Sequence, residues 1–114
     1  MKINILGTEY DFQIVNKEQD KRLGNKDGYC DMYEKTIRVV DVKEDEDDIG
    51  QCKNLKEYIK KISRHEIVHA FLCESGLYEN TNSIESWAYN EEMVDWIAFQ
   101  FPKMLEVFRQ VDAL

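Results

Sequence analysis

The two histidines of the chain lie four positions apart, in the stretch His65-Glu66-Ile67-Val68-His69. On an α-helix, residues i and i+4 project from the same face about one turn apart. Two imidazole nitrogens in this arrangement can bind one zinc ion at roughly 2.0–2.1 Å. Glu66 projects toward the same site, where a carboxylate can accept a proton from a metal-activated water. The pattern predicts a zinc-dependent hydrolase, with His65 and His69 as metal ligands and Glu66 as the catalytic base.

The simplest alternative is a metal-free domain in which both histidines are hydrogen-bonded core residues. Apolar residues recur at three- and four-residue steps on both sides of the motif, which predicts one long helix. This periodicity places His65, Glu66 and His69 on the inward-facing stripe. A buried carboxylate without a partner is costly, so the placement favours a metal over a metal-free core.

The third metal ligand must come from elsewhere in the chain. Catalytic zinc usually has three protein ligands and an open fourth position, and no third histidine exists. Leu72 and Ser75 occupy the positions where the extended metzincin pattern requires glycine and histidine. A carboxylate or thiolate must therefore serve, and the acidic run from Asn90 to Asp95 is the downstream candidate.

This run resembles the gluzincins, the thermolysin-like zinc peptidases, in which Glu-x-x-x-Asp follows the histidine pair on a second helix. The resemblance implies Glu91 as third ligand and Asp95 as the acceptor that orients a ligand histidine, with Asn90 matching the asparagine before the ligand. A metal-bound imidazole normally donates its other N–H to such a partner. Glu92 is the rival ligand, but it points about 100° away from Glu91 on a helix. The face shared by Glu91 and Asp95 favours Glu91.

Within gluzincins, the compact chain resembles minimal peptidases encoded by phages and prophages, and the ImmA/IrrE-like proteins are a nearby comparison. The motifs that carry the resemblance are confined to residues 63–72 and 90–98. Thermolysin-like enzymes use a further histidine and tyrosine to stabilise the transition state, and no histidine remains here. Tyr89 and Tyr78 are candidate donors to an oxyanion. The expected activity is peptide-bond hydrolysis, and the alternative is a non-catalytic zinc-binding phage or prophage interaction module.

The first forty residues predict two β-hairpins, which reverse direction at Gly7-Thr8 and at Glu34-Lys35. Thr36–Val40 is rich in β-branched residues and is the clearest strand. We expect it at an exposed sheet edge, where an extended peptide can add as a further strand. The charged segment 17–28 predicts a loop.

Two long helices follow in the prediction. Asn54 with Glu57 predicts the start of the first helix, and Gly76 its end. Ser83 is expected to cap the second helix, and Pro102 to kink or stop it. A short final helix is expected from 103 to 111. The apolar residues assigned to the second and final helices are Ile84, Trp87, Ala88, Met93, Val94, Trp96, Ile97, Phe101, Met104, Leu105, Val107 and Phe108.

These elements predict an α+β fold, in which N-terminal antiparallel hairpins pack on a zincin-like pair of long helices plus a short C-terminal helix. A chain of 114 residues is expected to form one minimal zincin-like domain, residues 1–114. An apolar content of 43% excludes global disorder. The net charge of −8 argues against nucleic acid and anionic membranes as partners. A peptide or protein substrate is the expected partner, and composition leaves the oligomeric state open.

The remaining features point to the cytoplasm. Residues 1–7 lack the continuous apolar core of a signal peptide. Cys30, Cys52 and Cys73 are widely spaced, which predicts reduced thiols and disfavours a structural zinc site built from all three. The acidic run 44–48 predicts a solvated loop rather than a calcium site, because Ile49 occupies a ligand position.

Overall fold

Two β-hairpins form one four-stranded sheet. The computed structural model describes residues 1–83 and 85–114, apart from the side chain of Phe108. Its strands are β1 (Lys2–Ile5), β2 (Thr8–Val15), β3 (Gly28–Asp31) and β4 (Thr36–Val40), in the sheet order β1-β2-β4-β3. Each hairpin is antiparallel, and parallel pairing of β2 with β4 joins the two. The predicted α+β class with N-terminal hairpins is confirmed.

The first hairpin turns one residue earlier than predicted. Leu6 and Gly7 have φ values of 50° and 91°, and two consecutive positive φ angles are typical of a type I′ turn. The Gly7 amide donates a hydrogen bond to Asn4 Oδ1 at 2.9 Å. This turn sets the register in which Ile3 faces Tyr10.

The prediction that Thr36–Val40 forms an exposed edge was wrong, because β4 lies between β2 and β3. Ile37 and Val39 are fully buried. The β-branched side chains that made this strand easy to recognise are those that an interior strand buries. The edge on this side of the sheet is β3, which follows two short 3₁₀ turns at Lys17–Gln19 and Lys21–Leu23.

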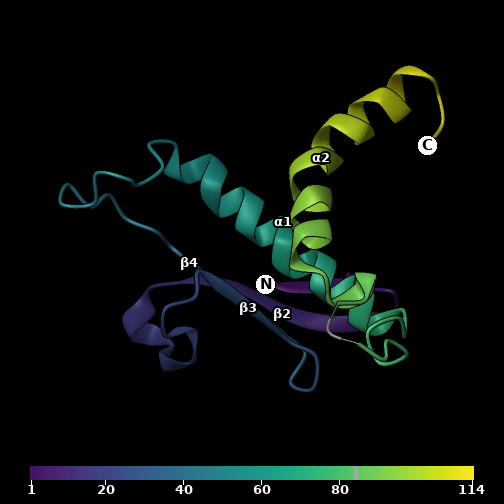
Figure 1. Cartoon of the computed structure of the whole chain (residues 1–114), viewed down its shortest axis with the longest axis horizontal. Coiled ribbons are helices and arrows are strands. Elements are labelled where there is room, and N and C mark those ends of the chain that lie inside the picture. Colours follow the sequence, from purple (N-terminus) through teal and green to yellow (C-terminus); the bar gives the residue numbers. More distant parts are fainter. Residues whose placement is uncertain (84) are drawn as a thin grey trace.

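The first long helix, α1 (Leu55–Glu74), packs on one face of the sheet (Figure 1). It begins as predicted, because the Asn54 side chain accepts a hydrogen bond from the Glu57 amide at 3.3 Å. Gly76 follows its end with a φ of 81°. The helix and the sheet share one core, formed by Ile5, Tyr10, Ile37, Val39, Ile62 and Ala70.

Glu74 fastens the end of α1 to the first hairpin. Its carboxylate accepts hydrogen bonds from Tyr10 Oη at 2.7 Å and from Thr8 Oγ1 at 3.0 Å. Lys35, in the turn between β3 and β4, pairs with the same carboxylate. The position of α1 over the sheet is therefore defined by polar contacts as well as by the core.

The second long helix, α2 (Glu91–Gln110), begins later than predicted. Its cap is Asn90, whose side chain accepts from the Met93 amide at 2.9 Å, rather than Ser83. A 3₁₀ turn at Trp87–Tyr89 precedes it. Ile84, which we assigned to this helix, lies outside the described residues.

Pro102 lies inside α2, so the separate final helix predicted after it is wrong. A proline lacks the amide that would bond the carbonyl four residues earlier, here that of Ala98. Arg64 Nε, from α1, donates to this carbonyl at 2.5 Å instead. The helix continues, and Figure 1 shows it changing direction partway along its length.

Among the described side chains of α2, the buried ones lie in its first half. Val94 and Ala98 are fully buried, whereas Phe101, Met104 and Val107 are exposed. The far end of the helix projects away from the sheet (Figure 1). Among the described residues, no helix has the length and apolar character needed to cross a membrane.

Candidate metal centre

The buried face of α1 presents the motif as its spacing predicts. His65 Nε2 and His69 Nε2 lie 3.0 Å apart, and 17% of each side chain is exposed. Glu66 is buried, with 7% exposure. One potential ligand atom from each of His65, Glu66 and His69 lies within 4.8 Å of the others. This cluster can hold a metal ion.

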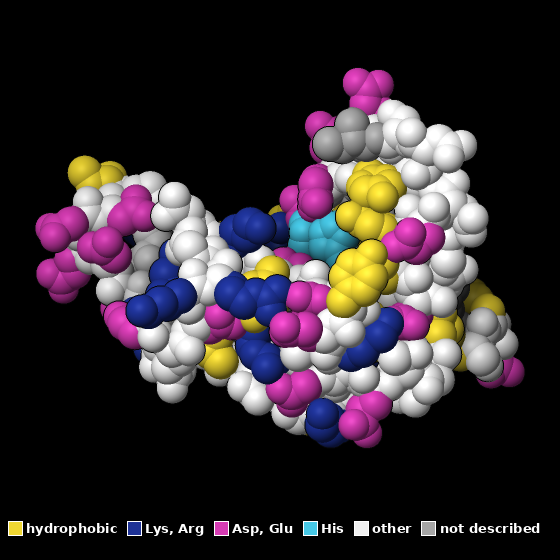
Figure 2. All heavy atoms as spheres, turned by 90° about the horizontal axis from the view of Figure 1, so that it is seen from below, with side chains coloured by type: hydrophobic (Ala, Val, Ile, Leu, Met, Phe, Trp, Pro, Cys, Tyr) yellow, Lys and Arg dark blue, Asp and Glu magenta, His cyan; other side chains and the backbone are white. Residues whose placement is uncertain are grey.

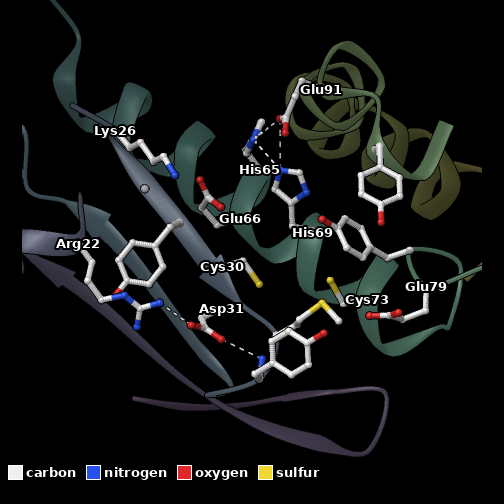
Figure 3. Close-up of a pocket in the computed structure, with 16 residues that line it drawn as sticks. Arg22, Lys26, Cys30, Asp31, His65, Glu66, His69, Cys73, Glu79 and Glu91 are labelled. Carbon is white, nitrogen blue, oxygen red and sulfur yellow. Dashed lines mark hydrogen bonds and ion pairs between the residues drawn. The ribbon is translucent and has the colours of Figure 1, made fainter. Parts of the chain in front are cut away.

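The start of α2 brings Glu91 to both histidines. Glu91 Oε2 lies 3.1 Å from His65 Nε2 and 3.3 Å from His69 Nε2 (Figure 3). Its side chain is 67% exposed, so it lies on the solvent side of the cluster. Glu92 is also exposed, and within the described chain it forms no ion pair with either histidine. The structure thus brings Glu91, and not its neighbour, over the histidine pair.

Asp95, one turn after Glu91, contacts the opposite side of the His65 ring. Its Oδ1 atom lies 2.7 Å from His65 Nδ1. A carboxylate accepts hydrogen bonds, so Nδ1 carries the proton and the Nε2 atom of neutral His65 keeps its lone pair. His65 Nε2 and Glu91 Oε2 are then both acceptors, and His69 Nε2 is a third when its ring proton is on Nδ1. A shared cation or proton is needed to make this arrangement favourable.

Lys61 also contacts Asp95, although the sequence pattern did not identify it as part of the site. Lys61 Nζ lies 2.5 Å from Asp95 Oδ1 and 4.9 Å from the centre of the Phe99 ring. Burial on its own would raise the pKa of Asp95, but hydrogen bonds from Lys61 and His65 outweigh it and lower this pKa. The available signal was helical spacing, since Lys61 precedes His65 by four positions.

The pKa values of two members of the motif, Glu66 and His69, are shifted from those of free side chains. Burial and the charge of Glu91 raise the pKa of Glu66 to about 7. Burial lowers the pKa of His69, although the charge of Glu91 opposes the change. A neutral imidazole is the form that binds a metal. At neutral pH the metal-free site therefore offers a ligand-competent His69 beside a Glu66 that readily gains or loses a proton.

The cluster opens into a cleft of about 1050 Å³. Figure 2 shows the histidines exposed in this hollow, with basic side chains on one side. Residues of β3 line one wall, and Tyr78 and Tyr89 line another part. The two tyrosine rings lie 4.1 Å apart, centre to centre. Both predicted oxyanion donors are thus in the same cleft as the histidines.

The three cysteines are free thiols and do not form one group. Cys30 and Cys73 line the cleft, whereas Cys52 is exposed on a separate shallow hollow. Burial raises the pKa of Cys30 to about 12, so its thiol is protonated at neutral pH. The described arrangement does not bring all three together as one set of metal ligands.

Comparison with known protein families, with curated protein sequences and with solved structures gave no match.

Proposed function

We propose that the protein is a zinc-dependent peptidase whose ligands are His65, His69 and Glu91. The observation that carries this proposal is the triangle of His65 Nε2, His69 Nε2 and Glu91 Oε2, with sides of 3.0, 3.1 and 3.3 Å. Tetrahedral zinc with bonds of 2.0–2.1 Å needs ligand atoms about 3.3–3.4 Å apart. A displacement of a few tenths of an ångström would bring the triangle to that size.

The type of ligand also favours zinc. Two imidazoles and one carboxylate form a common catalytic zinc set, which leaves a fourth position open. Glu66 also offers a carboxylate oxygen within 4.8 Å of a ring nitrogen of each histidine, but in the described chain it pairs directly with neither ring. We therefore assign Glu91 to the metal and Glu66 to the chemistry beside it.

Zinc in such a site acidifies a water molecule to a pKa of about 7 and polarises a carbonyl group. Glu66 accepts the proton of the attacking water and transfers it to the leaving amine. A pKa near neutrality, as at Glu66 before metal binding, suits a group that must both take and give a proton. Asp95 holds the His65 ring, and Tyr78 or Tyr89 donates to the carbonyl oxygen.

We assign substrate binding to strand β3, the edge strand next to β4. The Val40 amide donates to the Asp27 carbonyl at 2.8 Å. Asp27 and Val40 therefore form a hydrogen-bonded pair. Such pairs alternate with non-bonded pairs along an antiparallel ladder, so the backbone N–H and C=O groups of Gly28 and Cys30 point away from β4, toward the unpaired edge of the sheet. An extended peptide or protein segment can pair with these groups, and both residues line the cleft.

The Glu66→Gln variant tests this function. We expect it to retain one zinc ion per chain by mass spectrometry under native conditions. Cleavage of a mixed peptide library, read as new termini, should fall at least about 100-fold, the lower range for loss of a general base. The Glu79→Gln variant is the control, because Glu79 lines the same cleft away from the triangle.

Undiminished cleavage by the Glu66→Gln protein would remove Glu66 from the mechanism. Bound zinc without cleavage of any peptide by the unaltered protein would favour the non-catalytic binding module. A protein that binds no zinc would refute both proposals.

A further inference from the structure

A glycine on the edge strand lies against the proposed proton acceptor. A Cβ atom at position 28 would lie 2.9 Å from Glu66 Oε1 and 3.0 Å from Glu66 Cγ. Non-bonded carbon atoms pack at about 3.5–4.0 Å, so a side chain at this position requires Glu66 to move. We propose that Gly28 is a positioning residue, whose missing side chain determines where the Glu66 carboxylate lies. The inference rests on the proposed role of Glu66.

Backbone conformation does not account for this glycine. The glycines with left-handed φ values are Gly7, Gly24 and Gly76, and Gly28 is not among them. It begins β3 and pairs with Val39 in a regular register. Glycine weakens a strand and often marks a close approach of another group. Here the approaching group is a buried carboxylate.

Glu66 lies between strand β3 and the cleft, which it lines. Strand β3 lies on one side, and the histidines and Glu91 lie on the other (Figure 3). Glu74 holds α1 to the sheet, so the helix itself cannot easily retreat. A methyl group at position 28 would therefore push the Glu66 carboxylate away from β3, into the cleft that the histidines and Glu91 also line. Such a shift changes the space and charge at the open coordination position without removing a ligand.

A stability cycle on the metal-free protein tests the contact. Gly28→Ala is made in the unaltered chain, in Glu66→Gln and in Glu66→Ala, and urea unfolding is followed with a chelator present. We expect Gly28→Ala to lower the urea midpoint equally in the unaltered chain and in Glu66→Gln, because the glutamine side chain keeps the atoms that contact position 28. The loss should shrink or reverse with Glu66→Ala. Equal losses in all three backgrounds would overturn the inference, because the contact at 3.1 Å to the Arg38 carbonyl would then explain them.

The matched control is Gly50→Ala, which adds the same methyl group at another glycine without a left-handed φ. Its nearest neighbour would be Asp48 Oδ1 at 3.5 Å, an ordinary contact. Its effect on the urea midpoint should not depend on residue 66. A dependence as large as that at position 28 would also count against the inference.

Cobalt(II) gives a second measurement, which a purely structural role would not alter. We expect Gly28→Ala to bind cobalt(II) but to shift its visible absorption band, whereas Gly50→Ala leaves the band unchanged. With a cleaved peptide, kcat should fall about 100-fold, as for a catalytic group misplaced by about 1 Å, at unchanged KM. An unchanged band together with an unchanged kcat would overturn the inference. The stability cycle needs neither metal nor substrate, so it judges Gly28 even if peptidase activity is absent.

Discussion

At the residue scale, His65 has distinct partners on its two ring nitrogens. Nδ1 faces Asp95 at 2.7 Å, whereas Nε2 faces Glu91 at 3.1 Å. The first contact fixes the proton on Nδ1, and this leaves Nε2 available as a ligand. Lys61 balances the charge of Asp95. The ring is thus oriented before any ion arrives, which lowers the entropic cost of binding.

The two neighbouring glutamates at the start of α2 give a matched pair of variants. We predict that Glu91→Ala weakens zinc binding by more than the 10- to 100-fold typical for loss of an outer partner, because a direct ligand is lost. Glu92→Ala should leave the affinity unchanged, since its carboxylate does not reach the histidines. Competition with a chromophoric chelator measures both. Equal effects of the two substitutions would contradict the assignment of Glu91.

The sequence located the site by two signals: helical spacing within the motif, and a resemblance that pointed to Glu91 and Asp95, which the structure brings to His65. His65, Glu66 and His69 needed only the pitch of one helix. Gly28 could not be identified, because its contact with Glu66 depends on how β3 packs against α1, across 38 positions of the sequence (66 − 28). Lys61 had the right spacing, but lysines at such spacings are common on exposed helix faces.

At the element scale, Pro102 deprives a carbonyl inside α2 of its usual backbone partner. This carbonyl belongs to Ala98, and it accepts a hydrogen bond from Arg64 Nε at 2.5 Å. Arg64 is adjacent to His65, and Ala98 lies one turn beyond Asp95. The contact therefore joins α1 and α2 close to the region where their metal-site residues meet.

Replacing Arg64 by methionine keeps the aliphatic stem and removes the donor. We predict a loss of about 1–3 kcal/mol in the free energy of unfolding, the usual cost of an unsatisfied buried acceptor. In a Pro102→Ala background the loss should be smaller, because alanine restores a backbone amide for Ala98. Urea unfolding of the four proteins measures the coupling. Identical losses in both backgrounds would show that Arg64 acts in another way.

The contacts of Glu74 predict how α1 responds to acid. Hydrogen bonds from Lys35, Tyr10 and Thr8 lower the pKa of Glu74 from its usual 4.5. Because the folded-state pKa is the lower one, the stabilisation is present above pH 4.5 and is lost as the pH falls through the folded value. Glu74→Gln should cost about 1.5–3 kcal/mol at neutral pH and should flatten the acid limb of the stability curve. Glu106→Gln, on the exposed part of α2, should keep the original slope.

Local sequence signals predicted which helices and strands form better than they predicted how these elements pair and pack. Turn residues and β-branched runs were enough to identify both hairpins, and Asn54 was enough to place the start of α1. The parallel pairing of β2 with β4 could not be read from either strand, because it depends on the path of residues 16–35. The start of α2 was misplaced because Ser83 and Asn90 are both good caps, and local sequence does not rank them.

At the scale of the whole molecule, the proposed zinc ligands belong to two helices that lie far apart in the sequence. His65 and His69 come from α1, and Glu91 comes from α2. The described side chains of α2 that are fully buried, Val94 and Ala98, lie in its first half, so one shared ion would add a substantial link between the helices. Metal binding and folding are then coupled.

Zinc removal should therefore destabilise the entire chain. At a free zinc concentration about 1,000 times its Kd, the gain in the free energy of unfolding should be about 4 kcal/mol. Thermal or urea unfolding with and without a chelator measures this difference. The Glu91→Ala variant should show a smaller difference at the same zinc concentration. Superimposable curves for the unaltered protein would contradict metal binding by the folded state.

The contact between Arg64 and the carbonyl before Pro102 also has an evolutionary consequence. A proline at position 102 is tolerable because a guanidinium from the other helix replaces the missing amide. If the arginine were replaced first, the Ala98 carbonyl would have no hydrogen-bond donor. If the proline were replaced first, the backbone amide of residue 102 would supply one. In related chains, positions 64 and 102 should therefore change together, with the proline replaced before the arginine.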